Sequence, residues 1–271
     1  MAIVLVLAVV TAAATAVRST WSPCGLSMLS TVTPLAEAGR GRRWSRTAVW
    51  FVVGAVVGGL TLGALMAALA ALVALLGPSL GVVLGVATVA ALVCGASDLD
   101  LFGLHLPYHG RQVNERWLDR YRAWVYGGGF GWQIGVGLAT YITTAGIYLM
   151  ILLAAMSGEP LFALVLGAGF GLVRGLAILA GRSITSPDSL LQVHRRFGVL
   201  RQPVRLAVAA TLLLVGVAAA GAWTGIPGAA AATLVAVAVW VLSHPTRSTS
   251  PVDEGASFDA GGTPLRAPSA P

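Results

Sequence analysis

The chain has 271 residues, of which 57% are hydrophobic and 10% are charged, whereas about a quarter of the residues in soluble domains are charged. Several windows exceed the ~18 uncharged apolar residues that indicate a membrane span. This composition excludes an ordinary soluble domain and predicts an all-α polytopic protein of the cell membrane, with the lipid bilayer as its partner. The net charge of +7 does not indicate nucleic acid, because the arginines lie in short loops between apolar segments.

The first apolar segment, about 2–36, is too long for one straight crossing. Pro23 removes a hydrogen-bond donor, so a helix is expected to kink or break there. Cleavage sites of the signal-peptide type occur near Ala12–Ala16, but no basic residue precedes Arg18, so the segment is expected to remain.

Six further apolar segments follow along the chain. They are expected at 50–76, 79–96, 127–156, 160–181, 204–222 and 226–242. The sequence therefore predicts about seven transmembrane helices, although the last segment is short enough to lie on the surface or to re-enter the membrane instead.

The arginines gather in alternate connections between these segments. Because basic loops stay on the cytoplasmic side, the N-terminus is expected outside and the C-terminus inside. The tail 243–271 is rich in Pro, Ser, Gly and Thr and is expected to be disordered. The arginines concerned are Arg40, Arg42, Arg43, Arg46, Arg111, Arg116, Arg120, Arg122, Arg182, Arg195, Arg196, Arg201 and Arg205.

Residues 1–97 and 127–222 follow the same plan of a long first helix with an irregular centre and two more helices. With the cytoplasmic loop 98–126 between them, they form two predicted inverted repeats, and 223–242 adds one extra helix. Transporters with such repeats build a site at the broken helices.

The second repeat carries its polar residues around 140–146. Candidate binding residues are therefore Pro23 in the first break and Thr140, Tyr141, Thr143 and Thr144 in the second. The alternative is that the threonine hydroxyls bond to the preceding helical turn.

The opening third carries a recognisable pattern. Ser22-Pro23-Cys24-Gly25-Leu26 is followed by the basic loop 40–46 and a glycine-rich helix, and Phe130-Gly131-Trp132 leads into the second half. This arrangement resembles the CcdA/DsbD family of transmembrane electron carriers.

The resemblance implies thiol-disulfide exchange that passes reducing equivalents across the membrane, for cytochrome c maturation or thiol redox, with a thioredoxin-like partner. It assigns a catalytic role to Cys24. The family's second cysteine has no counterpart near Thr143, so Cys94 is the other candidate thiol, and whether the two pair is left open.

Two other functions remain open: a small-solute or ion exporter on an inverted-repeat scaffold, and a membrane assembly subunit without chemistry. Arg174 lies inside an apolar segment, where it either binds an anionic solute or extends toward the cytoplasmic end.

No metal or cofactor is expected. His105 and His109 are four apart, but Pro107 between them argues against a helical pair of ligands. The segment Gln112 to Trp124 is amphipathic and is expected to lie at the cytoplasmic interface.

Overall fold

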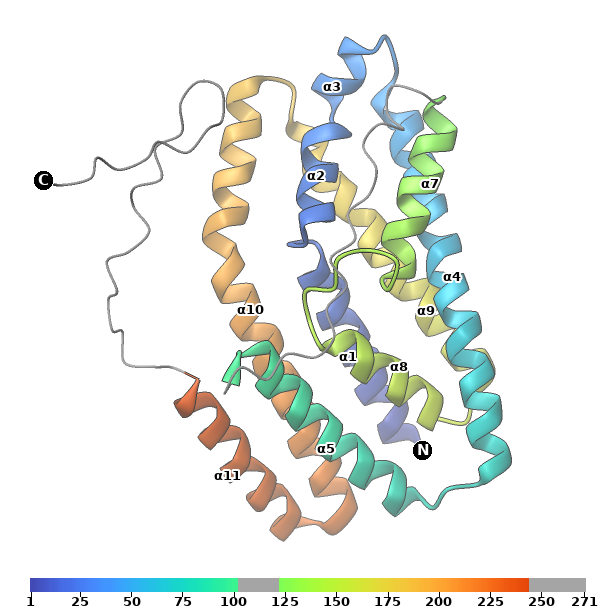
Figure 1. Ribbon diagram of the computed structural model, residues 1–271, viewed down its shortest axis with the longest axis vertical. Coiled ribbons are helices and arrows are strands. Elements are labelled where there is room, and N and C mark those ends of the chain that lie inside the picture. The colour runs from blue at the N-terminus through green and yellow to red at the C-terminus, as the bar shows by residue number, and fades with distance from the viewer. Residues whose placement is uncertain (102–121, 244–271) are drawn as a thin grey trace, which may run out of the picture.

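The computed structural model describes residues 1–101 and 122–243, and this part of the chain is helical without strands (Figure 1). Five stretches are long and apolar enough to cross a membrane. They are α1 (Ala2–Ser19), α4 (Trp44–Leu76), α5 (Leu80–Asp98), α9 with the 3-10 turn η2 (Pro160–Ser183), and α10 (Pro187–Thr224). The expectation of an all-α chain of apolar helices is thus confirmed.

Two apolar helices are shorter, α8 (Gly146–Met156) and α11 (Ile226–Leu242). The 11 residues of α8 extend about 17 Å, roughly half the hydrocarbon core of a bilayer. The expected count of seven spanning helices is therefore not confirmed.

The first apolar segment breaks where proline predicts. Helix α1 ends at Ser19, and the chain restarts as α2 (Pro23–Thr31) and α3 (Pro34–Gly39). The Ser22 side chain accepts a hydrogen bond from the Gly25 N–H at 3.1 Å, and Pro23 occupies the first helical position. Serine at the cap and proline just inside it are the preferred start of a helix, so residues 22–25 end one helix and begin another.

The segment 127–156 is not one helix. It divides into α7 (Ala123–Val136) and α8, and residues 137–145 between them are not α-helical. Helix α7 ends at Gly137 with φ +74°, a backbone region that glycine adopts without steric cost. The polar residues 140–144 lie in this irregular stretch, as expected for a broken helix, while the inverted symmetry of the two halves stays a prediction.

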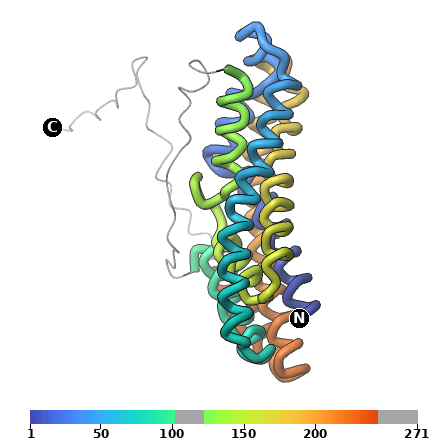
Figure 2. The backbone as a smooth tube through the Cα atoms, turned by 90° about the vertical axis from the view of Figure 1, so that its right-hand side faces the viewer, coloured from blue at the N-terminus to red at the C-terminus, as the bar shows by residue number. Residues whose placement is uncertain are grey.

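Helix α4 packs closely against α7 on one side and α9 on the other (Figures 1 and 2). A Cβ atom added at Gly131 would lie 2.0 Å from the Phe51 carbonyl oxygen, and one at Gly59 would lie 2.3 Å from that of Gly167. Only glycine allows such an approach. Gly59 and Gly63 of α4 and Gly167 and Gly171 of α9, each pair spaced at four residues, form such close backbone contacts.

Helix α10 begins earlier than the predicted segment 204–222. The Ser186 side chain caps it, Ser189 completes a capping box, and Pro187 is at the first position. The arginines from Arg195 to Arg205, predicted in a loop, therefore lie on a helix. Helix α10 packs along α5 and α11 (Figure 1).

Several expectations fall on residues outside the described ranges. These are His105 and His109, most of the predicted interfacial helix, most of the loop 98–126, and the tail after Ser243.

Candidate functional site

The Asp98 carboxylate holds the irregular stretch before α8 against the end of α5. Thr144 Oγ1 donates to Asp98 Oδ2, and the Ala145 N–H donates to Oδ1 at 2.6 Å. Asp98 is only 8% exposed. Because Ala145 is the residue that caps α8, the carboxylate also lies at a helix N-terminus, where negative charge is stabilised.

Two arginines balance this buried charge. Arg18, near the end of α1, is 8% exposed and interacts electrostatically with Asp98. Arg205 of α10 donates from Nε to the Asp98 backbone oxygen at 3.0 Å and forms an ion pair with Asp100 at 2.7 Å. A buried carboxylate is costly unless it is paired and hydrogen-bonded, and here both conditions are met.

A cavity of about 160 Å³ lies beside these groups. Arg18, Arg201 and Arg205 line it together with the two aspartates, Asp98 and Asp100. Tyr141 and Thr143 of the irregular stretch complete its polar wall. Positive charge therefore exceeds negative charge by one around the cavity.

The threonine hydroxyls in and around residues 137–145 differ in their hydrogen bonding. Thr144 bonds to Asp98, whereas the buried hydroxyls of Thr140 and Thr143 have no hydrogen-bond partner among the described residues. On the facing helix α1, the Thr11 and Thr15 hydroxyls are likewise without partner. The alternative that Thr140, Thr143 and Thr144 bond to a preceding helical turn is thus wrong.

Arg174 lies at a separate place, between the two helix breaks. It is 3% exposed, with Cζ 5.5 Å from the centroid of the Phe170 ring. A Cβ atom at Gly137 would lie 3.2 Å from its guanidinium nitrogen. The adjoining cavity measures about 10 Å³, room for about one water molecule. Arg174 is therefore surrounded by protein, and the cavity beside it is too small for a solute larger than water.

The two cysteines are free, buried thiols in different surroundings. Cys24, at the start of α2, is 1% exposed and interacts electrostatically with Arg174. Cys94 is 4% exposed and lies one turn before Asp98, with which it interacts. Since thiol exchange needs an accessible thiolate, neither sulfur is placed to meet a redox partner in this conformation.

A second buried carboxylate, that of Glu37 in α3, joins α3, α4 and α7 near the N-terminal end of α4. Thr47 Oγ1 donates to Glu37 Oε2 at 2.6 Å, and the Tyr126 hydroxyl donates to Oε1. Arg40 Nη1 lies 3.3 Å from Oε1. Burial, together with the Glu37 carboxylate, raises the pKa of Tyr126 above its ordinary value. The phenol therefore stays protonated and keeps its role as a donor.

The sequence interpretation missed Glu37 and did not count Asp98 as a site residue. A signal was present, because they are the only acidic residues among the first 99. An ionisable group within or beside an apolar segment is costly and indicates a site. Tyr126 donates to Glu37 and Thr144 donates to Asp98. Both donors are too distant in the sequence from their carboxylates for a sequence pattern to predict the pairs.

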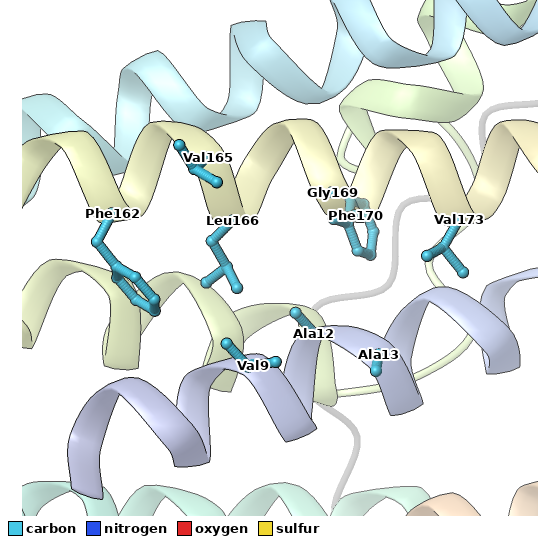
Figure 3. Close-up of a pocket in the computed structure, with 9 residues that line it drawn as sticks. All are labelled: Val9, Ala12, Ala13, Phe162, Val165, Leu166, Gly169, Phe170 and Val173. Carbon is cyan, nitrogen blue, oxygen red and sulfur yellow. The ribbon is translucent and has the colours of Figure 1, made fainter. Parts of the chain in front are cut away.

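An apolar groove of about 270 Å³ lies between α1 and α9 (Figure 3). Valine, leucine, phenylalanine and small residues line it, Gly169 of α9 among them. These side chains are apolar and offer no reactive group.

These observations define a class of protein: a helical protein with membrane-length apolar helices, interrupted twice by buried polar residues. Methylamine utilization protein MauF of Paracoccus versutus is 34% identical over 201 residues, 74% of this chain and 72% of that protein. MauF of Paracoccus denitrificans is 34% identical over 179 residues, 64% of this chain and 62% of its own length. MauF of Methylobacillus flagellatus is 32% identical over 166 residues, which are 59% of this chain and 57% of that protein. The chain belongs to the MauF family.

Searches of protein-family profiles and of solved structures give no match. The relatives correct the interpretation made from residues 22–26. They are named for methylamine utilization, so the assignment to the CcdA/DsbD family, and with it thiol-disulfide electron transfer for cytochrome c maturation, is wrong. The names give no better support to an exporter or an assembly subunit. The physical reason for the error is that Ser22, Pro23 and Gly25 serve a helix cap, which needs no redox chemistry.

Proposed function

We propose that this chain acts in methylamine utilization as a multi-pass membrane protein. The observation that carries the proposal is the 34% identity over 72% of a MauF protein. The five long apolar helices support the membrane location, because a hydrocarbon core of about 30 Å requires about 20 apolar residues per helix.

In the proposed arrangement α8 and α11 complete seven membrane segments. The arginines of the α3–α4 connection and of the first half of α10 lie in the cytoplasm, and the N-terminus lies outside. The breaks at 20–22 and 137–145 each interrupt the first segment of one half, which supports an inverted repeat.

The part of the protein on which the role depends is the Asp98 site with its cavity. An ionisable group buried at the end of an apolar helix is costly and persists when function requires it, and here it fixes the irregular stretch that forms one wall of the cavity. Asp98 is a positioning residue in this account.

The sign of the charge argues against methylammonium as the occupant of this cavity. An alkylamine is protonated near neutral pH, as the Lys side chain is. Three arginines surround the cavity and both aspartates are already engaged. The proposed role is therefore exerted on another component of methylamine utilization and not by binding the amine here.

Disruption of the gene in the organism that carries it tests the role. The disrupted strain is expected not to grow with methylamine as its only nitrogen source and to grow normally with ammonium. Re-expression of the chain from a plasmid is expected to restore growth on methylamine. Equal growth of the disrupted and parental strains on methylamine would contradict the proposal.

A further inference from the structure

We infer that the cavity beside Asp98 is a binding site for a phosphate group, with an anionic phospholipid headgroup as its natural source. The chemistry of the site stands on the charged and polar groups around the cavity. The assignment to a lipid rests in addition on the proposed membrane location.

The charged groups around the cavity are unequally paired. Asp98 is held by Thr144, Ala145 and Arg18, and Asp100 pairs with Arg205. Arg201 lines the same cavity, yet within the described part of the chain it forms no ion pair and no hydrogen bond. One cation of the cavity is therefore left for a ligand.

The two arginines of α10 in the cavity are arranged to bind a phosphate. Arg201 and Arg205 are four residues apart on α10 and share a face of the helix. A guanidinium presents its N–H groups as a planar fork that matches phosphate oxygens. Arg201 thus meets a phosphate at the mouth of the cavity, with Arg205 one turn deeper beside Asp98.

A hydroxyl group without a partner also belongs to the cavity lining. Thr143 lines the cavity, and its buried Oγ1 has no hydrogen-bond partner among the described residues. A buried hydroxyl without a partner is unfavourable, and donation to a phosphate oxygen removes that cost. The cavity volume of about 160 Å³ is several times the roughly 30 Å³ that one water molecule occupies.

The source of the phosphate follows from the depth of the cavity. Helices α1 and α5 have 18 and 19 residues and end beside it, at Ser19 and Asp98. Their lengths of about 27–29 Å match a hydrocarbon core of about 30 Å. The cavity therefore lies where lipid headgroups lie, and basic pockets between membrane helices bind anionic headgroups.

Thermal unfolding of the purified full-length protein in detergent tests the site. The probe is short-chain phosphatidylglycerol, titrated against phosphatidylcholine of the same chain length, with inorganic phosphate as a third arm. The variant is Arg201→Gln, and its matched control is Arg196→Gln, which removes the same charge from an exposed position of the same helix outside the cavity lining. Thr143→Val removes the hydroxyl at nearly constant volume.

Phosphatidylglycerol is expected to raise the unfolding temperature of the wild type and of Arg196→Gln at the same concentration. Arg201→Gln is expected to need at least about tenfold more lipid, since charge-assisted hydrogen bonds contribute about 1.5–3 kcal/mol, and Thr143→Val an intermediate amount. If inorganic phosphate produces the same shift with the same dependence on Arg201, the phosphate chemistry stands and free phosphate is the source.

Equal responses of the Arg201 and Arg196 variants would overturn the inference, as would equal binding of phosphatidylcholine. Because binding is measured on purified protein, the outcome is independent of growth on methylamine. A failure of the proposed role and a failure of the phosphate site are therefore distinguishable.

Discussion

The close contact between α4 and α9 predicts opposite effects of alanine at two glycines of α9, Gly171 and Gly169. A Cβ atom at Gly171 would lie 2.2 Å from the Ala55 carbonyl oxygen and 2.8 Å from the Gly59 Cα. Both neighbours are backbone atoms, so Gly171→Ala must push the helices apart. At Gly169, two residues earlier, no atom lies within 4 Å of an added Cβ, and this residue borders the open groove between α1 and α9 (Figure 3).

The magnitude follows from two opposing effects. Alanine is favoured over glycine in a helix by about 1 kcal/mol, which both variants gain. Forcing extra volume into a close contact costs about 1–3 kcal/mol, occasionally more, which only Gly171→Ala suffers. The two variants are therefore expected to differ by about 1–3 kcal/mol, or roughly 2–12 °C in unfolding temperature for a chain of this size.

The assay is thermal unfolding of the purified variants in one detergent, followed by intrinsic tryptophan fluorescence. Gly169→Ala is expected to unfold at or above the wild-type temperature and Gly171→Ala below it. If Gly171→Ala were as stable as Gly169→Ala, the close approach of α4 and α9 would be refuted, and with it the scaffold on which both polar sites stand.

Three further predictions concern the buried polar groups. Glu37→Gln is expected to lower the free energy of unfolding by about 1–3 kcal/mol, because the carboxylate accepts from both Thr47 and Tyr126; an unchanged thermal midpoint would contradict this. Asp98→Asn is expected to lower the free energy of unfolding by a similar amount, since an amide cannot accept from both of the present donors. Asp100→Asn, at a side chain 52% exposed, should change it by no more than about 0.5 kcal/mol. The same unfolding assay compares the two variants. Cys24 and Cys94, both buried, are expected to resist a maleimide in the folded protein and to react after denaturation; prompt labelling in the folded state, followed by mass spectrometry, would show that the burial is wrong.

Local chemistry explains what the sequence predicts correctly. Proline at position 23 lacks the N–H that a continuing helix needs, and α2 begins at this residue after the break at 20–22, so the first break is confirmed. Glycines at a spacing of four share one helix face, which is why those of α4 and α9 meet in a close contact. Both features depend on residues that are close in sequence.

The start of α10 shows a local signal that was outweighed. Ser186, Pro187 and Ser189 provide the capping pattern of a helix N-terminus. The apolar pattern alone placed the helix further on, because its first half is polar and carries the arginines that were assigned to a loop.

The candidate site could not be predicted as a whole because its contacts are distant in sequence. Thr144 was predicted as a binding residue from its polar neighbours, but its partner Asp98 is 46 residues away. Arg205, which bonds to the Asp98 backbone, is 107 residues away. Position on a helix predicts neither pairing, since each depends on how α5, α8 and α10 meet.

Growth on methylamine is the most direct test of the central claim that the Asp98 site supports the role in methylamine utilization. The disrupted strain carries either Asp98→Asn or Asp188→Asn, each present in the membrane fraction at the wild-type level by immunoblot. Asp188 is exposed in the first turn of α10 and lies outside the cavity lining. The Asp98→Asn strain is expected to grow no faster than the disrupted strain with methylamine as its only nitrogen source, and the Asp188→Asn strain is expected to grow like the wild type. Wild-type growth of the Asp98→Asn strain would contradict the claim.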